Sequence, residues 1–216
     1  MLDRHLHPRL KPWLNRAAEK LDRPGITPDG ITLVGFAIGV LALPFLALGW
    51  YAPALVAIML NRLLDGLDGA LARRRGLTDA GGFLDIALDF LFYALVPFGF
   101  ILANPLENAL AGGWLLFAFI GTGSSFLAFA ALAAKHQIDN PGYAHKSFYY
   151  LGGFTEGSET IALFVLSCLF PGYFAGMAWF FGGLCWLTTF TRVWSGYVTL
   201  ASLEARQQGA AGTGED

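Results

Sequence analysis

Four aspartates stand out in this sequence because each lies in a stretch that is otherwise mostly apolar. Asp65 and Asp68 are three residues apart and Asp85 and Asp89 are four apart, so on helices each pair shares one face. The segment 74–80 between the pairs is short, which makes the two helices antiparallel neighbours and lets the four carboxylates face one another. Near the centre of a bilayer each charge costs roughly 2.5–3.5 kcal/mol, so four repelling carboxylates need a counter-charge.

A divalent cation, or two ions about 4 Å apart, is the counter-charge that suits this arrangement best. Arg62 and Arg73 can supply part of it. Because the ligands are all oxygens, with no His or Cys nearby, they favour Mg²⁺, Mn²⁺ or Ca²⁺ over Zn²⁺. We therefore predict that the four aspartates bind metal, with Mg²⁺ or Mn²⁺ as the expected cofactor.

The composition places these helices in a membrane. Hydrophobic residues make up 55% of the 216 residues and charged residues only 14%, against roughly 25% charged in an average soluble domain. A water-covered surface cannot be built over most of such a chain, so we predict an integral membrane protein and exclude disordered, fibrous and nucleic-acid-binding proteins. The two cysteines, Cys168 and Cys185, lie in apolar runs and do not form a disulfide framework.

Apolar stretches of about 20 residues are long enough to span a bilayer as helices. The apolar sequence is interrupted at 49–53 and at 171–172, and the fifth of the resulting stretches, 157–170, is short. The expected fold is an all-α polytopic membrane protein with six transmembrane helices, at about 31–50, 53–73, 82–103, 109–134, 157–170 and 173–200.

The basic residues predict how these helices are oriented. All fourteen Lys and Arg residues precede the first span, surround the end of the second, lie between the fourth and fifth, or lie in or after the sixth. The turns near 50, 105 and 171 contain none. By the positive-inside rule both termini and the aspartates face the cytoplasm, and we expect a protein of a bacterial inner membrane.

The segment before the first span is amphipathic. Apolar residues recur at helical spacing between charges, at Leu10, Trp13, Leu14, Ala17, Ala18 and Leu21. Two interpretations stay open: a helix lying on the cytoplasmic leaflet, or one packed on its own domain. We assign 1–25 to an interfacial helix, 26–203 to one six-helix membrane domain and 204–216 to a flexible tail.

The aspartates belong to a longer pattern, which reads Asp65-x-x-Asp68-Gly69-x-x-Ala72-Arg73, then seven residues, then Gly81-x-x-x-Asp85-x-x-x-Asp89. This pattern resembles the signature of the class I CDP-alcohol phosphotransferases, also called CDP-alcohol phosphatidyltransferases. The resemblance extends to the six spans, to the interfacial helix and to the segment 27–32, where the family more often has Asn in place of Asp29. It also implies a homodimer.

The resemblance implies a role for each aspartate. Metal held by Asp65, Asp68 and Asp85 would neutralise a cytidine-linked pyrophosphate and stabilise CMP as the leaving group. Asp89 is expected to be the catalytic base that accepts the proton of the acceptor alcohol, instead of or alongside metal contact.

The nucleotide pocket also follows from the resemblance. Arg73 is expected to bind phosphate, and Gly69, Ala72 and Gly81 to line the pocket for the nucleotide, together with Thr27. Placement near the cytoplasmic end of the spans would let a lipid-linked CDP enter sideways while its acyl chains stay among the membrane lipids.

The acceptor pocket is less well defined by the sequence. Arg192 and Lys135 belong to or border spans and could hold an anionic acceptor, although anchoring or snorkelling at the membrane surface explains Lys135 equally well. Glu156 and Glu159 suggest the opposite, a cationic or hydroxyl-rich acceptor, unless they only cap the fifth helix.

The expected function is transfer of a phosphatidyl group from CDP-diacylglycerol to a small hydroxyl acceptor, with release of CMP. A polyol or polyol phosphate such as glycerol 3-phosphate or inositol phosphate is favoured. One alternative is transfer of the CDP-choline or CDP-ethanolamine type to diacylglycerol. Another is a cation transporter that uses the four aspartates, although the inverted repeats and broken helices common in transporters are not evident in the sequence.

Overall fold

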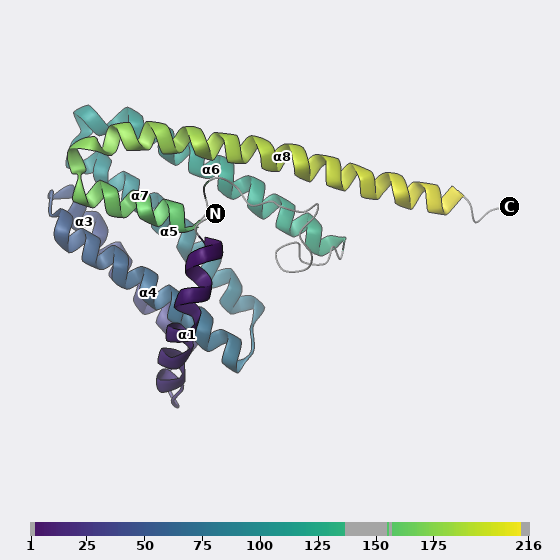
Figure 1. The fold of residues 1–216 in the computed structure, drawn as a ribbon, viewed down its shortest axis with the longest axis horizontal. Helices are drawn as coiled ribbons and strands as arrows, with labels where there is room; N and C mark the ends of the chain where they lie inside the picture. Colours follow the sequence, from purple (N-terminus) through teal and green to yellow (C-terminus); the bar gives the residue numbers. More distant parts are fainter. Residues whose placement is uncertain (1–2, 137–154, 156, 213–216) are drawn as a thin grey trace.

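The computed structural model describes residues 3–136, 155 and 157–212, and all regular structure in that part of the chain is helical, which confirms the all-α prediction. Figure 1 shows the helices, which are in chain order α1 Asp3–Leu21, α2 Pro28–Val40, α3 Ala42–Ala47, α4 Tyr51–Arg75, α5 Asp79–Ala103, α6 Pro105–Lys135, α7 Gly157–Leu169, the short 3-10 turn η1 Pro171–Tyr173, and α8 Phe174–Gly212.

Four helical stretches of the described chain are long and apolar enough to cross a membrane: Pro28–Ala47, Asp79–Ala103, Pro105–Lys135 and Pro171–Leu203. They correspond to the first, third, fourth and sixth predicted spans. The second, α4, carries charged residues throughout the half that begins at Arg62. The fifth, α7, has 13 residues, or about 20 Å, which is short of a hydrocarbon core of about 30 Å. The six-span arrangement therefore stays a prediction.

Two helix boundaries differ from the prediction. The first predicted span is divided at Leu41 into α2 and α3. Pro44 explains this division, because its ring nitrogen cannot donate a hydrogen bond to the carbonyl of Val40 and its ring crowds that carbonyl. At the other end of the chain α8 continues to Gly212, so helix extends into the segment for which the sequence predicts a flexible tail.

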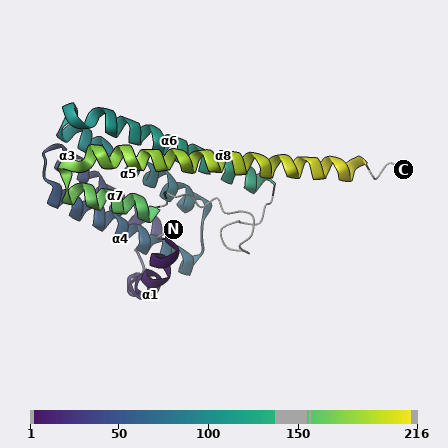
Figure 2. The same ribbon diagram turned by 45° about the horizontal axis from the view of Figure 1, so that its top comes forward.

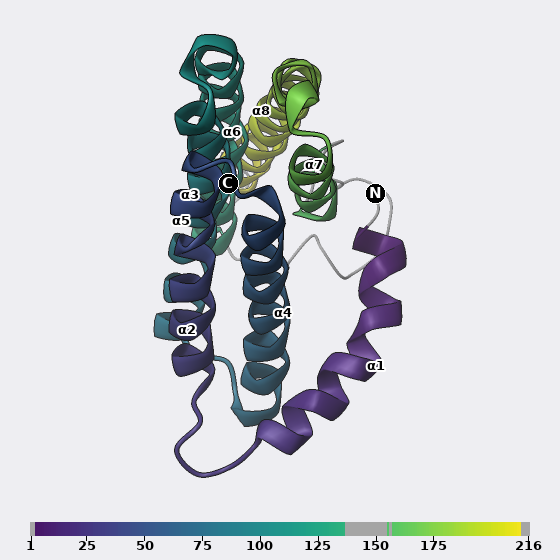
Figure 3. The same cartoon turned by 90° about the vertical axis from the view of Figure 1, so that its left-hand side faces the viewer.

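Helix α1 packs against its own domain. Its residues Leu14, Ala17, Ala18 and Leu21 form a small apolar cluster with Ile26, Ile31, Leu64, Leu67, Ala70 and Leu71. Figure 3 shows α1 crossing beside the end of α4. Leu10 and Trp13 remain 53% and 70% exposed, so one apolar face of α1 is free to meet a lipid surface. Contact with the membrane interface stays a prediction.

The larger core is aromatic and is centred on α5. Phe92 and Phe100 are fully buried, and Phe100 stacks on Phe174 at 4.4 Å between ring centroids. Helices α6 and α8 lie side by side, and α8 extends beyond the rest of the molecule (Figures 1 and 2). This frame fixes α5 relative to α4 and so positions the aspartates that the two helices carry.

The orientation can be tested at two exposed leucines. Leu77, between α4 and α5, is 77% exposed, and Leu106, at the start of α6, is 99% exposed. We expect Leu77→Cys in intact cells to react with a membrane-permeant maleimide only, because the basic residues place that turn in the cytoplasm. Leu106→Cys should also react with an impermeant maleimide. Both native cysteines are buried, so the parent protein is the background control. The reverse labelling pattern would invert the predicted orientation.

Candidate active site

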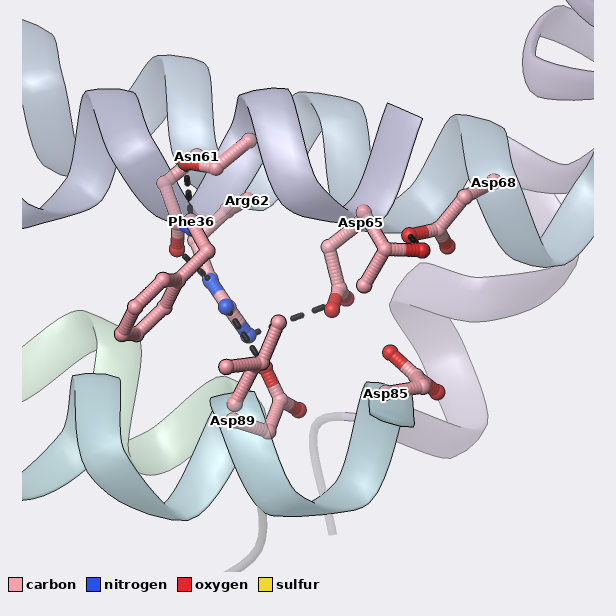
Figure 4. A pocket seen from close by; sticks show the side chains of 10 residues that line it. Phe36, Asn61, Arg62, Asp65, Asp68, Asp85 and Asp89 are labelled. Atoms are coloured by element: carbon pink, nitrogen blue, oxygen red, sulfur yellow. Dashed lines mark hydrogen bonds and ion pairs between the residues drawn. The ribbon is translucent and has the colours of Figure 1, made fainter. Parts of the chain in front are cut away.

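Helices α4 and α5 bring the four predicted aspartates to one place. Asp65, Asp68, Asp85 and Asp89 line a cavity of about 220 Å³, together with Thr32, Gly35, Phe36, Asn61, Arg62 and Leu88. Figure 4 shows the two carboxylates of α4 and the two of α5 pointing toward one another across the gap between the helices. The three- and four-residue spacings therefore place each pair on the facing side of its helix, as the sequence predicts.

Arg62 supplies the counter-charge in this cavity. Its Nη2 lies 2.7 Å from Oδ1 of Asp89, and its Nη1 lies 3.7 Å from Oδ2 of Asp65 (Figure 4). The Arg62 side chain is 13% exposed, so this ion pair lies mostly out of water. One guanidinium opposite four carboxylates leaves the cavity net negative.

Asp68 has a different partner. It is 4% exposed, and the Thr32 hydroxyl of α2 donates a hydrogen bond of 2.5 Å to its Oδ2. Thr32 lies in the segment 27–32 that resembles the family, but the sequence predicts no contact between Thr32 and Asp68. That contact depends on the register with which α2 packs on α4.

The cavity has the chemistry of a divalent-cation site. Its donors are carboxylate oxygens and its charge is net negative, which suits Mg²⁺ or Mn²⁺. Among the described residues, however, no three His, Cys, Asp or Glu side chains converge to form a complete metal site. Arg62 and Thr32 instead engage oxygens of Asp89 and Asp68. The four aspartates that could bind a cation therefore lie in one cavity, but one oxygen of Asp89 is bound to Arg62 and one oxygen of Asp68 is bound to Thr32.

A second and larger cavity of about 1260 Å³ adjoins the first, since Thr32, Asp68 and Asp85 line both. All five residues predicted to bind nucleotide and phosphate line this cavity: Thr27, Gly69, Ala72, Arg73 and Gly81. Asp29 and Thr78 line it as well.

The helix starts at this cavity are capped by side chains. The hydroxyl of Thr27 accepts a hydrogen bond from the Gly30 amide at 3.1 Å, and Thr78 caps Gly81 in the same way at 3.1 Å. Thr27 begins α2 and Thr78 begins α5, so both helix N-termini border the cavity. Such ends favour anions, which matches the phosphate role predicted here.

Arg75 lines this cavity and binds the segment between α1 and α2 through a set of hydrogen bonds, called here the Asp22–Arg75 latch. Arg75, at the end of α4, donates from Nε to Oδ1 of Asp22 at 2.8 Å. It also donates to the backbone carbonyls of Ile26 and Arg23, the latter at 3.1 Å. These bonds hold the segment between α1 and α2, which leads directly into Thr27. The Arg75 guanidinium holds the pKa of the Asp22 carboxyl below its ordinary value of 3.8.

A third cavity, of about 670 Å³, contains Arg192. Phe90 and Tyr93 of α5 line it beside residues of α6, α7 and α8. Arg62 donates to the Tyr93 hydroxyl at 3.4 Å, so Tyr93 connects this cavity to the Arg62–Asp89 pair. Arg192 itself donates to the Thr122 carbonyl at 3.2 Å and lies over the ring of Phe126.

The structure does not bring the other acceptor candidates to this cavity. Lys135 is exposed at the last residue of α6 and is not among the residues that line it. Glu159 lies in the first turn of α7, where an acidic residue is favourable next to the helix N-terminus. Glu156 lies outside the described residues. Of the two residues predicted to bind the acceptor, only Arg192 lines a cavity beside the aspartates.

Comparison with known proteins identifies the family. The family model of the CDP-alcohol phosphatidyltransferases matches residues 25–198, so the chain belongs to that family. The chain is 84% identical over 204 residues to the Escherichia coli K12 protein named inner membrane protein YnjF, covering 94% of this chain and 99% of that protein. It is 30% identical over 172 residues to a phosphatidylinositol phosphate synthase of Mycobacteroides abscessus, covering 76% and 71% of the two chains.

A solved structure shares the fold. The crystal structure of Mycobacterium tuberculosis phosphatidylinositol phosphate synthase with CDP-DAG bound aligns with a TM-score of 0.62 at 22% identity, over 85% of this chain and 93% of that one. Another crystal structure of the same synthase is in complex with manganese and citrate.

The Asp22–Arg75 latch predicts a pH dependence of stability. Because the pKa of Asp22 is lowered in the folded protein, its contribution is present above pH 3.8 and is lost as the pH falls through the lowered pKa. In thermal unfolding in detergent at pH 7, the Tm of Asp22→Asn should therefore lie below the Tm of the parent protein. This gap in Tm should narrow as the pH drops below 3.8. Glu19→Gln, an exposed change on α1, is the matched control and should show no such gap. A pH-independent gap would exclude the latch as its cause.

Proposed function

We propose that this protein transfers a phosphatidyl group from CDP-diacylglycerol to a small alcohol, a polyol phosphate in preference, and releases CMP. The observation that carries the proposal is that the four aspartates share one cavity and that this cavity adjoins a larger one lined by every residue predicted to bind nucleotide and phosphate. Asp68 and Asp85 border the large cavity that holds the predicted nucleotide residues, whereas Asp89 precedes Phe90 and pairs with the Arg62 that contacts Tyr93. A donor in the large cavity would reach Asp68 and Asp85, and Tyr93 connects the Arg62–Asp89 pair to the cavity that contains Arg192.

Asp65, Asp68 and Asp85 are the residues that would hold a divalent cation, with Asp89 as a further ligand. Such an ion, when bound, neutralises the pyrophosphate and stabilises the CMP leaving group. Arg73 lines the donor cavity and contributes a fixed positive charge for a phosphate. The capped starts of α2 and α5 direct backbone amides toward the same cavity.

Asp89 is the carboxylate best placed to take the proton of the acceptor hydroxyl. It is 29% exposed, and the residue that follows it, Phe90, lines the cavity that contains Arg192. Arg62 fixes its Oδ1, which leaves Oδ2 to receive a proton. General-base catalysis needs this combination of a held carboxylate and access from the acceptor side.

The acceptor preference rests on Arg192 and on the relatives. A cationic side chain that lines a cavity suits an acceptor that carries a phosphate. The relatives named phosphatidylinositol phosphate synthases support an acceptor of this class. Family membership also favours the transferase over a cation transporter. A homodimer and a cytoplasmic active site follow from the same family resemblance and from the charge distribution.

The metal role is tested by changing one aspartate at a time. Asp65→Asn, Asp68→Asn and Asp85→Asn should each abolish CMP release and weaken Mn²⁺ binding, because each removes an anionic ligand. Asp89→Asn should lower turnover by about 10²–10⁴ and leave CDP-diacylglycerol affinity nearly unchanged, because it removes the base and spares the donor side. Full activity of any one variant would remove that residue from the site.

The acceptor role of Arg192 is tested by kinetics. With glycerol 3-phosphate or inositol phosphate as acceptor, Arg192→Ala should raise the acceptor KM strongly and leave the CDP-diacylglycerol KM nearly unchanged, because one substrate loses its charge partner. Lys135→Ala is the matched control, since Lys135 does not line the cavity, and its acceptor KM should change little. Unchanged acceptor kinetics in Arg192→Ala would instead favour an uncharged or cationic acceptor.

A further inference from the structure

The part of α4 that carries Asp65 and Asp68 is also the only part of that helix that contains glycine, at Gly66 and Gly69. A glycine inside a helix destabilises it relative to alanine, because the unfolded glycine backbone has more conformational freedom to lose. Helix propensity therefore supports this turn poorly, and its geometry depends on the elements that pack on it. Two carboxylates whose spacing matters for a cation thus lie on a turn that needs outside support.

Leu14 of α1 gives this support by packing directly on Gly66. A Cβ atom at Gly66 would lie 3.1 Å from Cδ1 of Leu14 and 3.3 Å from its Cδ2, and its three nearest atoms all belong to Leu14. These distances are shorter than ordinary van der Waals contact, so even a methyl group at this position would displace Leu14. The absence of a side chain at Gly66 is therefore what lets α1 approach the turn so closely.

The contact lies on the side of α4 that faces away from the aspartate cavity. With 3.6 residues per turn, Gly66 lies about 130° around the helix axis from the direction midway between Asp65 and Asp68. Asp65 and Asp68 line the cavity of the four aspartates, and Gly66 and Leu14 are not among the residues that line it. Leu14 can therefore fix the turn without competing with a cation for any carboxylate oxygen.

Helix α1 is itself held on α4 along the same stretch. Ala18, one turn after Leu14, is fully buried in the apolar cluster that the two helices share. Asp22, directly after α1, lies 3.7 Å from Arg74 near the end of α4. The separation along the sequence from Leu14 to Gly66 equals that from Asp22 to Arg74, so the two helices run in the same direction here (Figure 3). Leu14 is thus fixed relative to the turn on which it packs.

We propose that Leu14 is a positioning residue for the aspartate cluster: its contact with Gly66 holds the turn that carries Asp65 and Asp68 in the geometry that binds a divalent cation. The proposal rests on the proposed function only in taking a cation to bind at these aspartates. Helix α1 then contributes to the active site from outside, although none of its described residues lines the aspartate cavity.

The test measures the affinity of the site for Mn²⁺. The full chain is purified in detergent, stripped with a chelator and titrated with Mn²⁺ alone, and free Mn²⁺ is measured by electron paramagnetic resonance. Leu14→Ala should raise the Kd for Mn²⁺ by about 10-fold, as expected when a group that positions metal ligands is removed. Leu14→Met keeps the side-chain volume and should retain the Kd of the parent protein.

Leu21→Ala is the matched control for loss of packing. It makes the same substitution on the same helix and in the same apolar cluster, but Leu21 is not among the atoms nearest to Gly66. Both alanine variants should lower the Tm of the protein, and only Leu14→Ala should raise the Kd for Mn²⁺. If Leu14→Ala does not fold, Leu14→Val replaces it, with Leu21→Val as its control.

A second pair of variants tests the contact from the side of α4. Gly66→Ala should raise the Kd for Mn²⁺ in the parent protein, because the new methyl group displaces Leu14 from the turn. In the Leu14→Ala background that methyl group has room, so Gly66→Ala should raise the Kd no further, and such non-additivity marks a direct contact. Gly113→Ala on α6, where a Cβ atom would meet nothing within 4 Å, is the control and should leave the Kd unchanged.

The outcomes distinguish this proposal from the proposed function. An unchanged Kd in Leu14→Ala, an equal rise in Leu21→Ala, or additive effects of Leu14→Ala and Gly66→Ala would each overturn the role of Leu14 and leave the transferase assignment intact. Failure of the parent protein to bind Mn²⁺ would overturn both proposals. Mn²⁺ binding without CMP release for any acceptor would count against the transferase alone, and the Kd values would still decide the role of Leu14.

Discussion

The concentration of negative charge between α4 and α5 is the constraint to which the rest of the structure responds. Four carboxylates share a small cavity at the end of apolar helices, where like charges repel and water screens them poorly. Arg62 offsets part of this charge, and the aromatic rings of α5 and the amide of Asn61 hold Arg62 in place. Close packing of α2 on α4, with Thr32 reaching Asp68, completes the response within the protein. The remaining negative charge is what prepares the site for a cation.

The sequence predicts the parts of this site that depend on spacing along one helix. The intervals between Asp65 and Asp68 and between Asp85 and Asp89 place each pair on one face, and the short connection makes the helices neighbours. The structure bears out the shared faces, since the four carboxylates line one cavity, but α4 and α5 do not pack closely on each other and are joined instead through α2, which packs on both. The residues predicted around the nucleotide also meet at one cavity, because they belong to the same two helix ends and the start of α2.

The parts that the sequence does not predict depend on how separate helices cross. The contact between Thr32 and Asp68 spans 36 positions, and the latch between Arg75 and Asp22 spans 53. Neither leaves a periodic signal, since each needs a particular register between two packed helices. Lys135 shows the opposite case, in which a basic residue in the expected part of the chain lies outside the cavity. The division of the first span at Leu41, in contrast, could have been read from Pro44.

The way the helices share the two large cavities has a consequence for how this family can diversify. The cavity that Arg73 lines is built from α2, α4, the start of α5 and the turn that joins α4 to α5. The cavity that Arg192 lines is built from α5, α6, α7 and α8, together with Thr155. Among the helices that the structure describes, α5 alone contributes to both. Substitutions in the last three helices can therefore reshape one binding region while the carboxylates and their packing stay unchanged. Under the proposed function, such a division lets related chains exchange one small alcohol for another and keep the same lipid-linked nucleotide chemistry.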